Sequence, residues 1–305
     1  MKVLITGGGG FIGSHAAEFY AKQGAEVVIF DNLSRPNLAW GRETNDFNCR
    51  YLLSHYCNVS WVREEILNQE SLRLNLKGSD LVIHAAAQTA VTTSYDHPLN
   101  DLLINTQGTL TMLEAVRREA RPPAVIFCST NKVYGSRPNQ IQIRETAMRY
   151  EFADPSFQYG IDEKFGVDLC AHTPYGCSKL AADLYLQDYA ARYGLKIGIF
   201  RQSCIYGPRQ FGIEDQGWLA WFAISTLSEK PIRIYGDGKQ VRDVLYVDDL
   251  IEAFDLFFQK VDGHQVFNIG GGSDNTASLL ETLDLLGELT GKRSLIHYRD
   301  WRPQD

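Results

Sequence analysis

The sequence predicts an α/β fold with a doubly wound parallel sheet. Three observations predict it. Apolar strand-like runs alternate with helical stretches through the first two thirds of the chain, a glycine-rich turn follows the first run, and 305 residues with 44% hydrophobic content can bury a large core. The buried strands are expected, in chain order, at Val3–Ile5, Glu26–Phe30, Asp80–His84, Ala124–Cys128 and Lys196–Phe200.

Helices are expected between these strands, at Ile12–Gln23, Asp101–Glu119 and Ser178–Tyr193. The alternation makes the strands parallel and places helices on both faces, which is why the strands are apolar throughout. Ligands of such folds bind beyond the carboxyl ends of the strands. The segment from Ser34 to Cys57 has no pattern that assigns it to a helix or a strand.

After Arg201 the alternation loosens. Gly207-Pro208 and Gly236-Asp237-Gly238 mark turns, an apolar helix is expected at Gly217–Ser228, and a further strand is expected at Gln265–Ile269. We expect residues 1–205 to form the main domain, to which 243–270 return, and residues 206–242 and 271–305 to form a smaller C-terminal lobe.

Composition excludes several classes of function. A net charge of −7 argues against a nucleic-acid surface, which needs a basic patch. The sequence has no apolar run of transmembrane length and no signal-peptide pattern before Lys2, so neither a membrane partner nor export is expected. The six cysteines form no Cys-x-x-Cys pair and no cluster with histidine, which indicates reduced thiols, no metal site and a cytoplasmic protein.

The glycine-rich turn is Thr6-Gly7-Gly8-Gly9-Gly10-Phe11-Ile12-Gly13, between the first strand and the first helix. Glycines let the backbone approach a pyrophosphate, and the start of the helix offers unpaired N–H groups to it. This context is typical of a Rossmann-type dinucleotide site. Two registers fit, one through Gly7 and one through Gly8, each with Gly10 and Gly13.

Asp31 ends the second strand. A carboxylate there accepts hydrogen bonds from a ribose diol and repels a 2′-phosphate, so NAD is favoured over NADP. Arg35, close by, is the residue type that accepts such a phosphate, but the carboxylate decides for NAD.

Tyr175 and Lys179 lie four residues apart, so they share one face of the expected helix. A free tyrosine has a pKa of about 10 and is a poor base at neutral pH. Lys179 and a positively charged nicotinamide both favour the phenolate, and we expect them to lower its pKa by roughly two to four units. Thr130, directly after the fourth strand, can hydrogen-bond the reacting oxygen.

The chain resembles the extended short-chain dehydrogenase/reductases over nearly its whole length. The tracts that carry the resemblance are Thr6–Gly13, Asp31, Asn105–Thr109, Thr130, Tyr175–Lys179, Gly207–Phe211 and Gly236–Asp243. The resemblance implies an NAD-dependent enzyme for nucleotide sugars, with Thr130, Tyr175 and Lys179 as catalytic residues and the C-terminal lobe binding substrate. It also implies a homo-oligomer, a dimer or tetramer paired through the helices expected at Asp101–Glu119 and Ser178–Tyr193.

The residues that the resemblance assigns to ligands fall into two sets. The cofactor set is Gly7, Gly10, Phe11, Ile12, Gly13, Asp31, Asn32, Ser34, Asn58, Val59, Ala85, Ala86, Gln88, Asn105, Tyr175 and Lys179. The substrate set is Gln88, Thr130, Arg209, Gln216, Arg242 and Arg302.

Within the family, the 4,6-dehydratases carry Thr-Asp-Glu where this chain has Thr130-Asn131-Lys132, so dehydration is disfavoured. The tracts Ser129–Gly135, Thr173–Lys179, Arg209–Phe211 and Asp215–Trp218 resemble the CDP-tyvelose 2-epimerases, also called CDP-paratose 2-epimerases. This implies epimerisation at C2 of a CDP-hexose, such as CDP-paratose to CDP-tyvelose or CDP-glucose to CDP-mannose.

The alternatives are a nucleotide-sugar 4-epimerase, a 4-ketosugar reductase, and a non-catalytic sensor that binds NAD without turnover. The chain also departs from the family at three places. Cys204 stands where many members carry an asparagine, Asn58 stands where an aspartate commonly meets adenine, and the sequence stops at Asp305, where members usually continue. We therefore expect a trimmed C-terminus.

Overall fold

The structure is a computed structural model that describes residues 1–34 and 46–302, so Arg35 and residues 303–305 lie outside the described part. Its centre is a seven-stranded sheet in the order β12-β8-β5-β4-β1-β2-β3, and every pairing in it is parallel. The strands are β1 (Lys2–Thr6), β2 (Glu26–Phe30), β3 (Val59–Val62), β4 (Leu81–His84), β5 (Ala124–Thr130), β8 (Ile197–Gln202) and β12 (His264–Ile269). The strand order reverses between β1 and β4, the place where ligands bind in such sheets.

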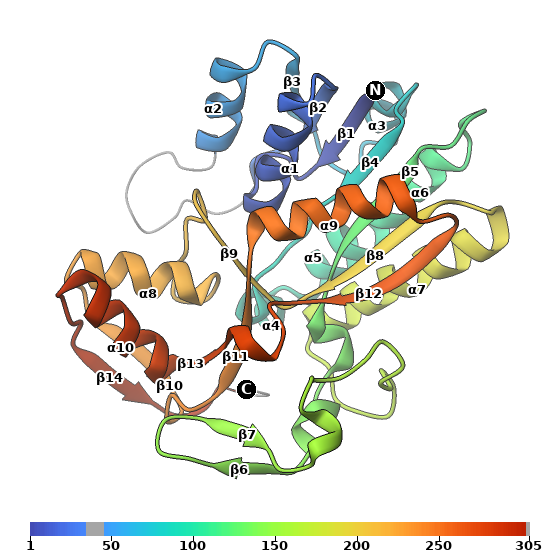
Figure 1. Cartoon of the computed structure of the whole chain (residues 1–305). Helices are drawn as coiled ribbons and strands as arrows, with labels where there is room; N and C mark the ends of the chain where they lie inside the picture. Colours follow the sequence, from blue (N-terminus) through green and yellow to red (C-terminus); the bar gives the residue numbers. More distant parts are fainter. Residues whose placement is uncertain (35–45, 303–305) are drawn as a thin grey trace.

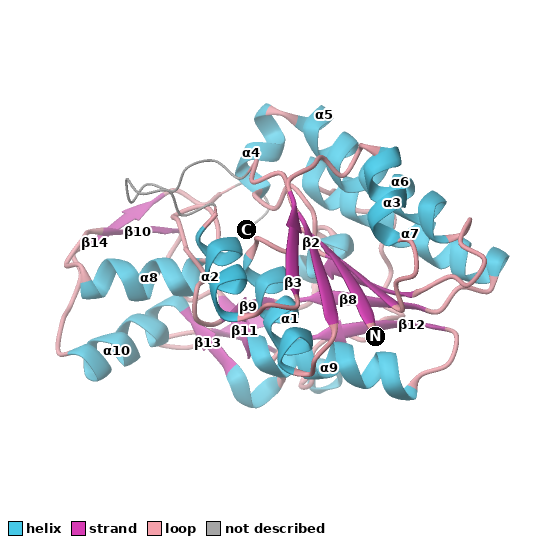
Figure 2. Ribbon diagram, turned by 90° about the horizontal axis from the view of Figure 1, so that it is seen from above, coloured by secondary structure: helices cyan, strands magenta, loops and turns pink. Residues whose placement is uncertain are grey.

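Helices cover both faces of this sheet (Figures 1 and 2). On one face lie α1 (Phe11–Lys22), α2 (Phe47–His55) and α9 (Val247–Lys260), and on the other lie α3 (Gln69–Leu76), α6 (Gly108–Val116) and α7 (Pro174–Tyr193). Each face has its own hydrophobic core, formed between the helices and alternate strand residues. The predicted doubly wound fold is therefore confirmed.

The helix predicted at Asp101–Glu119 is confirmed as helical through Val116, but it is not a regular α-helix. After the short helix α4 (Val91–Asp96), the chain forms α5 (Pro98–Asp101), a π-helical turn η1 (Leu102–Gln107) and then α6 without a break. A π turn shifts the faces of the helix, because its hydrogen bonds span one residue more than those of an α-helix. The residues on either side of η1 are therefore not aligned as on one continuous helix.

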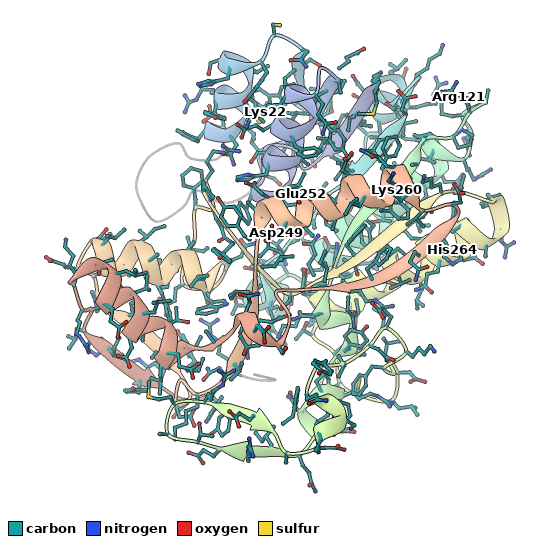
Figure 3. All side chains as sticks on the ribbon, in the orientation of Figure 1. Lys22, Arg121, Asp249, Glu252, Lys260 and His264 are labelled. Atoms are coloured by element: carbon teal, nitrogen blue, oxygen red, sulfur yellow. The ribbon has the colours of Figure 1, made fainter. Side chains whose placement is uncertain are left out.

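Helix α9 was not predicted, although its sequence carries a helical signal. Val247, Leu250, Ile251, Phe254 and Phe257 are buried against the sheet at helical spacing. The opposite face is charged and exposed, and Figure 3 shows two of its acidic side chains, Asp249 and Glu252, on the outer side. Within residues 1–34 and 46–302, no helix is both long and apolar enough to cross a membrane.

The segments after β8 build a smaller hydrophobic core of their own around Phe222, Ile232 and Ile234. Its elements are β9 (Cys204–Tyr206), α8 (Trp218–Leu227), β10 (Ile232–Tyr235), β11 (Val241–Tyr246), β13 (Thr276–Ser278), α10 (Leu279–Thr290) and β14 (Ile296–Arg299). The hairpin β6 (Ile143–Glu145) and β7 (Tyr150–Phe152) lies next to this region in Figure 1, and Tyr150 donates its hydroxyl hydrogen to Asp237 at 2.5 Å. The division of the chain into a main domain and a substrate lobe stays a prediction.

Candidate active site

The glycine-rich turn leads from β1 into α1, and its geometry requires glycine at two positions. Gly7 has a left-handed backbone with φ of 72°, and a Cβ there would lie 2.5 Å from the backbone nitrogen of Ala86. A Cβ at Gly13 would overlap the Gly7 carbonyl. The structure thus selects the register through Gly7, Gly10 and Gly13.

The start of α1 offers backbone donors to an anion. Gly10 precedes the first helical residue and has no side chain to cap the helix, so the N–H groups of Phe11, Ile12 and Gly13 have no cap from it. The backbone of Ala85 and Ala86 follows β4 and lies against the turn. This cradle of bare backbone and helix N-terminus fits the pyrophosphate of a dinucleotide.

Asp31 follows β2 at the same edge of the sheet. Its carboxylate accepts the N–H of Gly9 at 2.9 Å and that of Leu33 at 2.8 Å, so it also holds the glycine turn. Burial raises the pKa of Asp31, and the two N–H bonds oppose this rise. The position fits the predicted contact with a ribose diol.

The charge of Asp31 should set the choice of cofactor. We expect Asp31→Asn to reduce the preference for NAD over NADP by at least about tenfold, because the amide no longer repels a 2′-phosphate. Fluorescence titration with both dinucleotides measures this preference. Asp80→Asn is the control, since Asp80 lies at the opposite edge of the sheet and pairs with Arg121. An unchanged preference in Asp31→Asn would contradict the assignment.

Asn58 and Val59 are at the wrong edge of the sheet for the cofactor, which corrects the prediction. Val59 begins β3 and pairs with Val27 near the start of β2, so both predicted residues lie at the amino ends of the strands. The Asn58 amide donates to the carbonyls of Ala21 and Ala25, at 2.9 and 2.7 Å. Asn58 therefore fixes the connection from α1 to β2 and cannot contact adenine at the other edge.

Glu65 follows the carboxyl end of β3 and was missed by the sequence analysis. Its Oε2 accepts the side-chain amide of Asn32 at 2.7 Å, and the Asn32 Oδ1 in turn accepts the backbone N–H of Ser34 at 2.9 Å. The three residues therefore lie together at the cofactor edge. Assigning Val59–Val62 as a strand would have located Glu65, but the unassigned segment before it hid this strand.

The loop after β4 is held by Asn105. Asn105 accepts the N–H of Gln88 at 2.8 Å and donates to Ser178 Oγ on α7 at 2.9 Å. The Gln88 amide nitrogen donates to both carboxylate oxygens of Asp101, each at 3.0 Å. Both side chains, predicted to bind ligands, thus have partners inside the chain that position this loop against α7.

Thr130, Tyr175 and Lys179 are brought together where β5 ends against α7. Lys179 Nζ donates to the carbonyl of Cys128 at 2.7 Å and lies 4.0 Å from the ring centre of Phe127. The Thr130 hydroxyl lies near enough to the phenol of Tyr175 to affect its pKa, and Thr130 Oγ1 accepts the N–H of Lys132 at 3.2 Å. All three predicted catalytic side chains are buried.

The pKa values show what this burial does to the two titratable groups. Burial raises the pKa of Tyr175 to about 12, against the lowering effect of the nearby Thr130 hydroxyl. Burial also lowers the pKa of Lys179 to about 8, because a buried ammonium loses its hydration. The predicted lowering of the Tyr175 pKa is therefore not produced by the chain alone.

His84 lies fully buried at the end of β4, beneath this site. Its ring nitrogens bond Thr6 Oγ1 at 2.6 Å and Thr109 Oγ1 at 2.9 Å. Burial, with a smaller contribution from the Lys179 charge, lowers the pKa of His84 to about 3. The imidazole is therefore neutral in the folded chain at any pH above this value.

This burial gives a testable pH dependence. Below the ordinary histidine pKa of about 6.5, the unfolded chain binds a proton that folded His84 does not, so stability falls as the pH falls from there towards 3. We expect the loss to be up to about 1.4 kcal/mol per pH unit larger in the parent than in His84→Gln. Urea unfolding between these pH values measures it, and equal slopes would contradict a buried neutral imidazole.

The predicted substrate residues Gln216 and Arg302 each bond a side chain from another part of the chain. Gln216 donates its amide to Thr89 Oγ1, on the loop after β4. Arg302 donates to Asp215 at 2.8 Å, and its guanidinium lies 3.9 Å from the ring centre of Tyr235. Residues 215–216, just before α8, thus bond both the loop after β4 and Arg302 near the C-terminus.

Arg242, on β11, lies near Cys204 on β9. Burial raises the pKa of the Cys204 thiol, and the Arg242 charge opposes this rise. The Cys204 sulfur accepts the indole N–H of Trp218 at 3.3 Å. A cation at this position remains suited to a diphosphate even though cysteine replaces the family asparagine.

Arg209 does not join this group. Its Nη2 donates at 2.7 Å to Glu18 on α1, so its charge is matched by the cofactor helix. The contact of Arg209 with substrate, which the family resemblance implies, stays a prediction. Glu18 is distant in sequence, and no local pattern indicates the pair.

Comparisons with known proteins agree with this site. The sequence model of the NAD dependent epimerase/dehydratase family matches residues 3–270. The chain is 43% identical over 300 residues to the CDP-paratose 2-epimerase of Salmonella typhi, covering 94% of this chain and 83% of that protein. It is 30% identical to a putative UDP-glucose 4-epimerase of Methanocaldococcus jannaschii, with 95% and 83% covered.

Among solved structures, the chain is similar to the UDP-glucuronic acid 4-epimerase of Bacillus cereus in complex with UDP-glucuronic acid and NAD. The TM-score is 0.81 at 29% identity, with 100% of this chain and 88% of that chain covered. These similarities span the glycine turn, the residues Thr130, Tyr175 and Lys179, and the C-terminal elements, and they confirm the family resemblance found in the motifs. The chain belongs to the NAD dependent epimerase/dehydratase family.

Proposed function

We propose that this enzyme epimerises a CDP-activated hexose at C2, with CDP-paratose/CDP-tyvelose or CDP-glucose/CDP-mannose as the substrate pair. The observation that carries the proposal is the buried group of Thr130, Tyr175 and Lys179, with Asn131 and Lys132 beside Thr130. The Salmonella typhi relative, named CDP-paratose 2-epimerase, supports the choice of C2 and of CDP.

In this mechanism the chain moves one proton at the substrate hydroxyl. Tyr175 Oη takes the proton of the C2 hydroxyl and returns it after the sugar has presented its other face. Thr130 holds the reacting oxygen through its hydroxyl, and the Lys179 ammonium stabilises the phenolate. NAD, held by the glycine turn and Asp31, supplies the acceptor and donor of the hydride when bound.

The residues beside Thr130 argue against elimination of water. Losing a hydroxyl from the sugar needs an acid and a base in addition to the tyrosine. Asn131 offers an amide, whose Oδ1 lies 3.4 Å from Thr130 Oγ1, and Lys132 offers a cation. Because neither position carries a carboxylate, we expect the keto group formed by oxidation to be reduced back to a hydroxyl at the same carbon.

The second candidate is a 4-epimerase that acts on a nucleotide sugar. The Methanocaldococcus jannaschii relative and the Bacillus cereus structure, both named 4-epimerases, favour it. The triad serves either reaction, because the pose of the sugar decides which carbon reacts. A 4-ketosugar reductase would use the same residues but consume one reduced cofactor per product, and a sensor would give no product.

Proton NMR of CDP-paratose and of CDP-glucose, each incubated with the purified protein and NAD, tests the proposal. We expect the anomeric signal of the C2 epimer to appear without net change in NAD. A C4 epimer would establish the second candidate, and conversion only with stoichiometric NADH would establish the reductase. No conversion of either compound would overturn the assignment to CDP-sugars.

We also propose that two copies of the chain pair through α5, η1 and α7. Large apolar side chains are exposed on these neighbouring elements, among them Leu99, Leu102, Leu103 and Leu184. An exposed apolar surface on adjacent helices is typical of a subunit interface. The six cysteines are all free, which supports a cytoplasmic location for the assembly.

Charge placed in this surface should separate the subunits. We expect Leu102→Glu with Leu184→Glu to reduce the mass in solution to that of one 34.4 kDa chain, because the buried carboxylates would lack partners. Size-exclusion chromatography with light scattering measures the mass. Leu289→Glu on α10, where the side chain is 74% exposed, is the control that keeps the parent mass. A parent that is itself monomeric would contradict the proposal.

A further inference from the structure

A loop that begins at residue 207 connects β9 to residues 213–218, the tract that leads into α8. This loop has an unusual backbone. Arg209 adopts φ of 60°, the left-handed region that glycine prefers. A long side chain in this region costs of the order of 1 kcal/mol or more, and such strain persists only where surrounding contacts hold it. The contacts at Arg209 and its neighbours should therefore reveal what fixes the loop.

Two side chains of the cofactor helix α1 hold this loop. Glu18 accepts Arg209 Nη2 at 2.7 Å, and His15 Nε2 lies 2.8 Å from the carbonyl of Pro208. The Arg209 guanidinium also lies 4.6 Å from the ring centre of Tyr51 on α2. Because His15 and Glu18 are three residues apart, they present one face of α1 to the loop.

Glu18 is a buried carboxylate with several donors. Besides Arg209, it accepts the hydroxyls of Tyr51 at 3.2 Å and Tyr56 at 3.0 Å and pairs with Lys22 at 3.0 Å. Burial tends to raise its pKa, but the Lys22 and Arg209 bonds outweigh it and hold the pKa of Glu18 at about 2. The Glu18 carboxylate is therefore charged at every physiological pH, so its contact with Arg209 does not depend on pH in this range.

The loop connects the cofactor helix to the residues proposed to meet substrate. A Cβ at Gly207, its first residue, would touch Val247 and approach the Phe11 ring at the start of α1. At its other end the 213–218 tract begins, where Gln216 bonds Thr89 and Trp218 bonds Cys204. A shift of the loop would move this tract relative to the glycine turn.

We propose that Glu18 and Arg209 are positioning residues that lock the loop at residues 207–211 onto the cofactor helix and so fix the 213–218 tract against the active site. Neither residue needs to touch the substrate for this role. The rival is a direct contact between Arg209 and the substrate diphosphate. The rival has support in Arg209 Nε, which is buried without a hydrogen-bond partner among the residues that the structure describes.

Hydrogen exchange followed by mass spectrometry tests the lock without knowledge of the substrate. We expect Glu18→Gln to speed exchange of the backbone amides at 207–218 by about tenfold or more, because the charged partner that holds the strained loop is gone. Lys22→Gln is the matched control. It removes another cation from Glu18, but Lys22 is 61% exposed, lies on α1 itself and leaves Arg209 paired with the other carboxylate oxygen. Equal exchange in the two variants would overturn the lock.

Arg209→Gly removes the ion pair with Glu18 and at the same time relieves the backbone strain at this position. Glycine accepts a φ of 60° without cost, so this variant can keep the fold while losing the guanidinium. We expect its 207–218 amides to exchange as fast as those of Glu18→Gln. Exchange at the parent rate would overturn the proposal, because the loop would then hold its position without Glu18.

Enzyme kinetics distinguish a positioning role of Arg209 from a direct contact with the substrate diphosphate. This experiment rests on the proposed function. With the sugar nucleotide that the NMR assay converts, we expect Glu18→Gln to raise KM about tenfold and to change kcat by less than about twofold. If Arg209 instead binds the diphosphate, Arg209→Gly raises KM while Glu18→Gln leaves it unchanged or lowers it, since the arginine is released. That pattern would overturn the lock, whereas a wrong substrate assignment would leave the exchange result intact.

Discussion

Tyr175→Phe is expected to lower kcat by about a thousandfold while leaving NAD binding and the melting temperature close to those of the parent. The phenol oxygen is the only atom removed, and it is the proposed carrier of the substrate proton. The aromatic ring, which is buried at 8% exposure, stays in place. The NMR assay gives the rate, and dinucleotide titration with thermal unfolding gives the two unchanged properties.

A second tyrosine on the same helix provides the control. Tyr193 lies at the last turn of α7, is 45% exposed and makes an edge-to-face contact with the ring of Tyr189. Tyr193→Phe removes the same atom from the same element, and its turnover should match that of the parent. If Tyr175→Phe kept more than about a tenth of the parent turnover, the proton would have to come from another group.

The parts of this site that the sequence predicted are those with local signals. Tyr175 and Lys179 are four residues apart on one helix, and the helix periodicity alone places them together. The glycine turn is similarly local, because a strand, a turn and a helix that follow one another fix its geometry. The structure added the register, since only the approach of Ala86 to Gly7 distinguishes the two options.

The missed features depend on contacts between distant residues. Asn58 was assigned to adenine because the start of β3 was unknown, and an error of one strand length moves a residue to the other edge of the sheet. Arg209 was assigned to substrate from the family resemblance, and its pairing with Glu18, 191 positions away, has no local signal in the sequence. A charged residue in a sequence does not reveal whether its countercharge is a ligand or another part of the chain.

The least predictable feature is a buried ion pair between helix α7 and strand β8. Asp183 lies on α7 one helical turn beyond Lys179, on the same face. Its carboxylate receives two bonds of 3.1 Å from Arg201 on β8, and it also accepts Ser129 Oγ at 2.8 Å and Gln187 Nε2 at 2.7 Å. Asp183 is 0% exposed and Arg201 is 6% exposed. The pair joins the helix that carries Tyr175 to β8, the strand between β12 and β5 in the sheet.

Asp183→Ala is expected to reduce the free energy of unfolding by about 3–5 kcal/mol, because it leaves the Arg201 guanidinium buried without a countercharge. Chemical denaturation measures the loss. Asp188→Ala is the matched control on the same helix, since Asp188 is 54% exposed and pairs with an exposed Arg192 at 3.4 Å. Its effect should stay within about 0.5 kcal/mol.

Replacing both members of the pair tests whether the lost stability comes from the Arg201 charge that is left buried without a partner. In Asp183→Leu with Arg201→Met, no ion remains to be desolvated, so the double variant is expected to recover at least about half of the lost stability. Recovery cannot be complete, because the hydroxyls of Ser129 and Tyr134 then lose a partner each. A double variant as unstable as Asp183→Ala would instead mean that the pair is needed for its geometry. In that case α7 would depend on these hydrogen bonds to hold Tyr175 and Lys179 against β5.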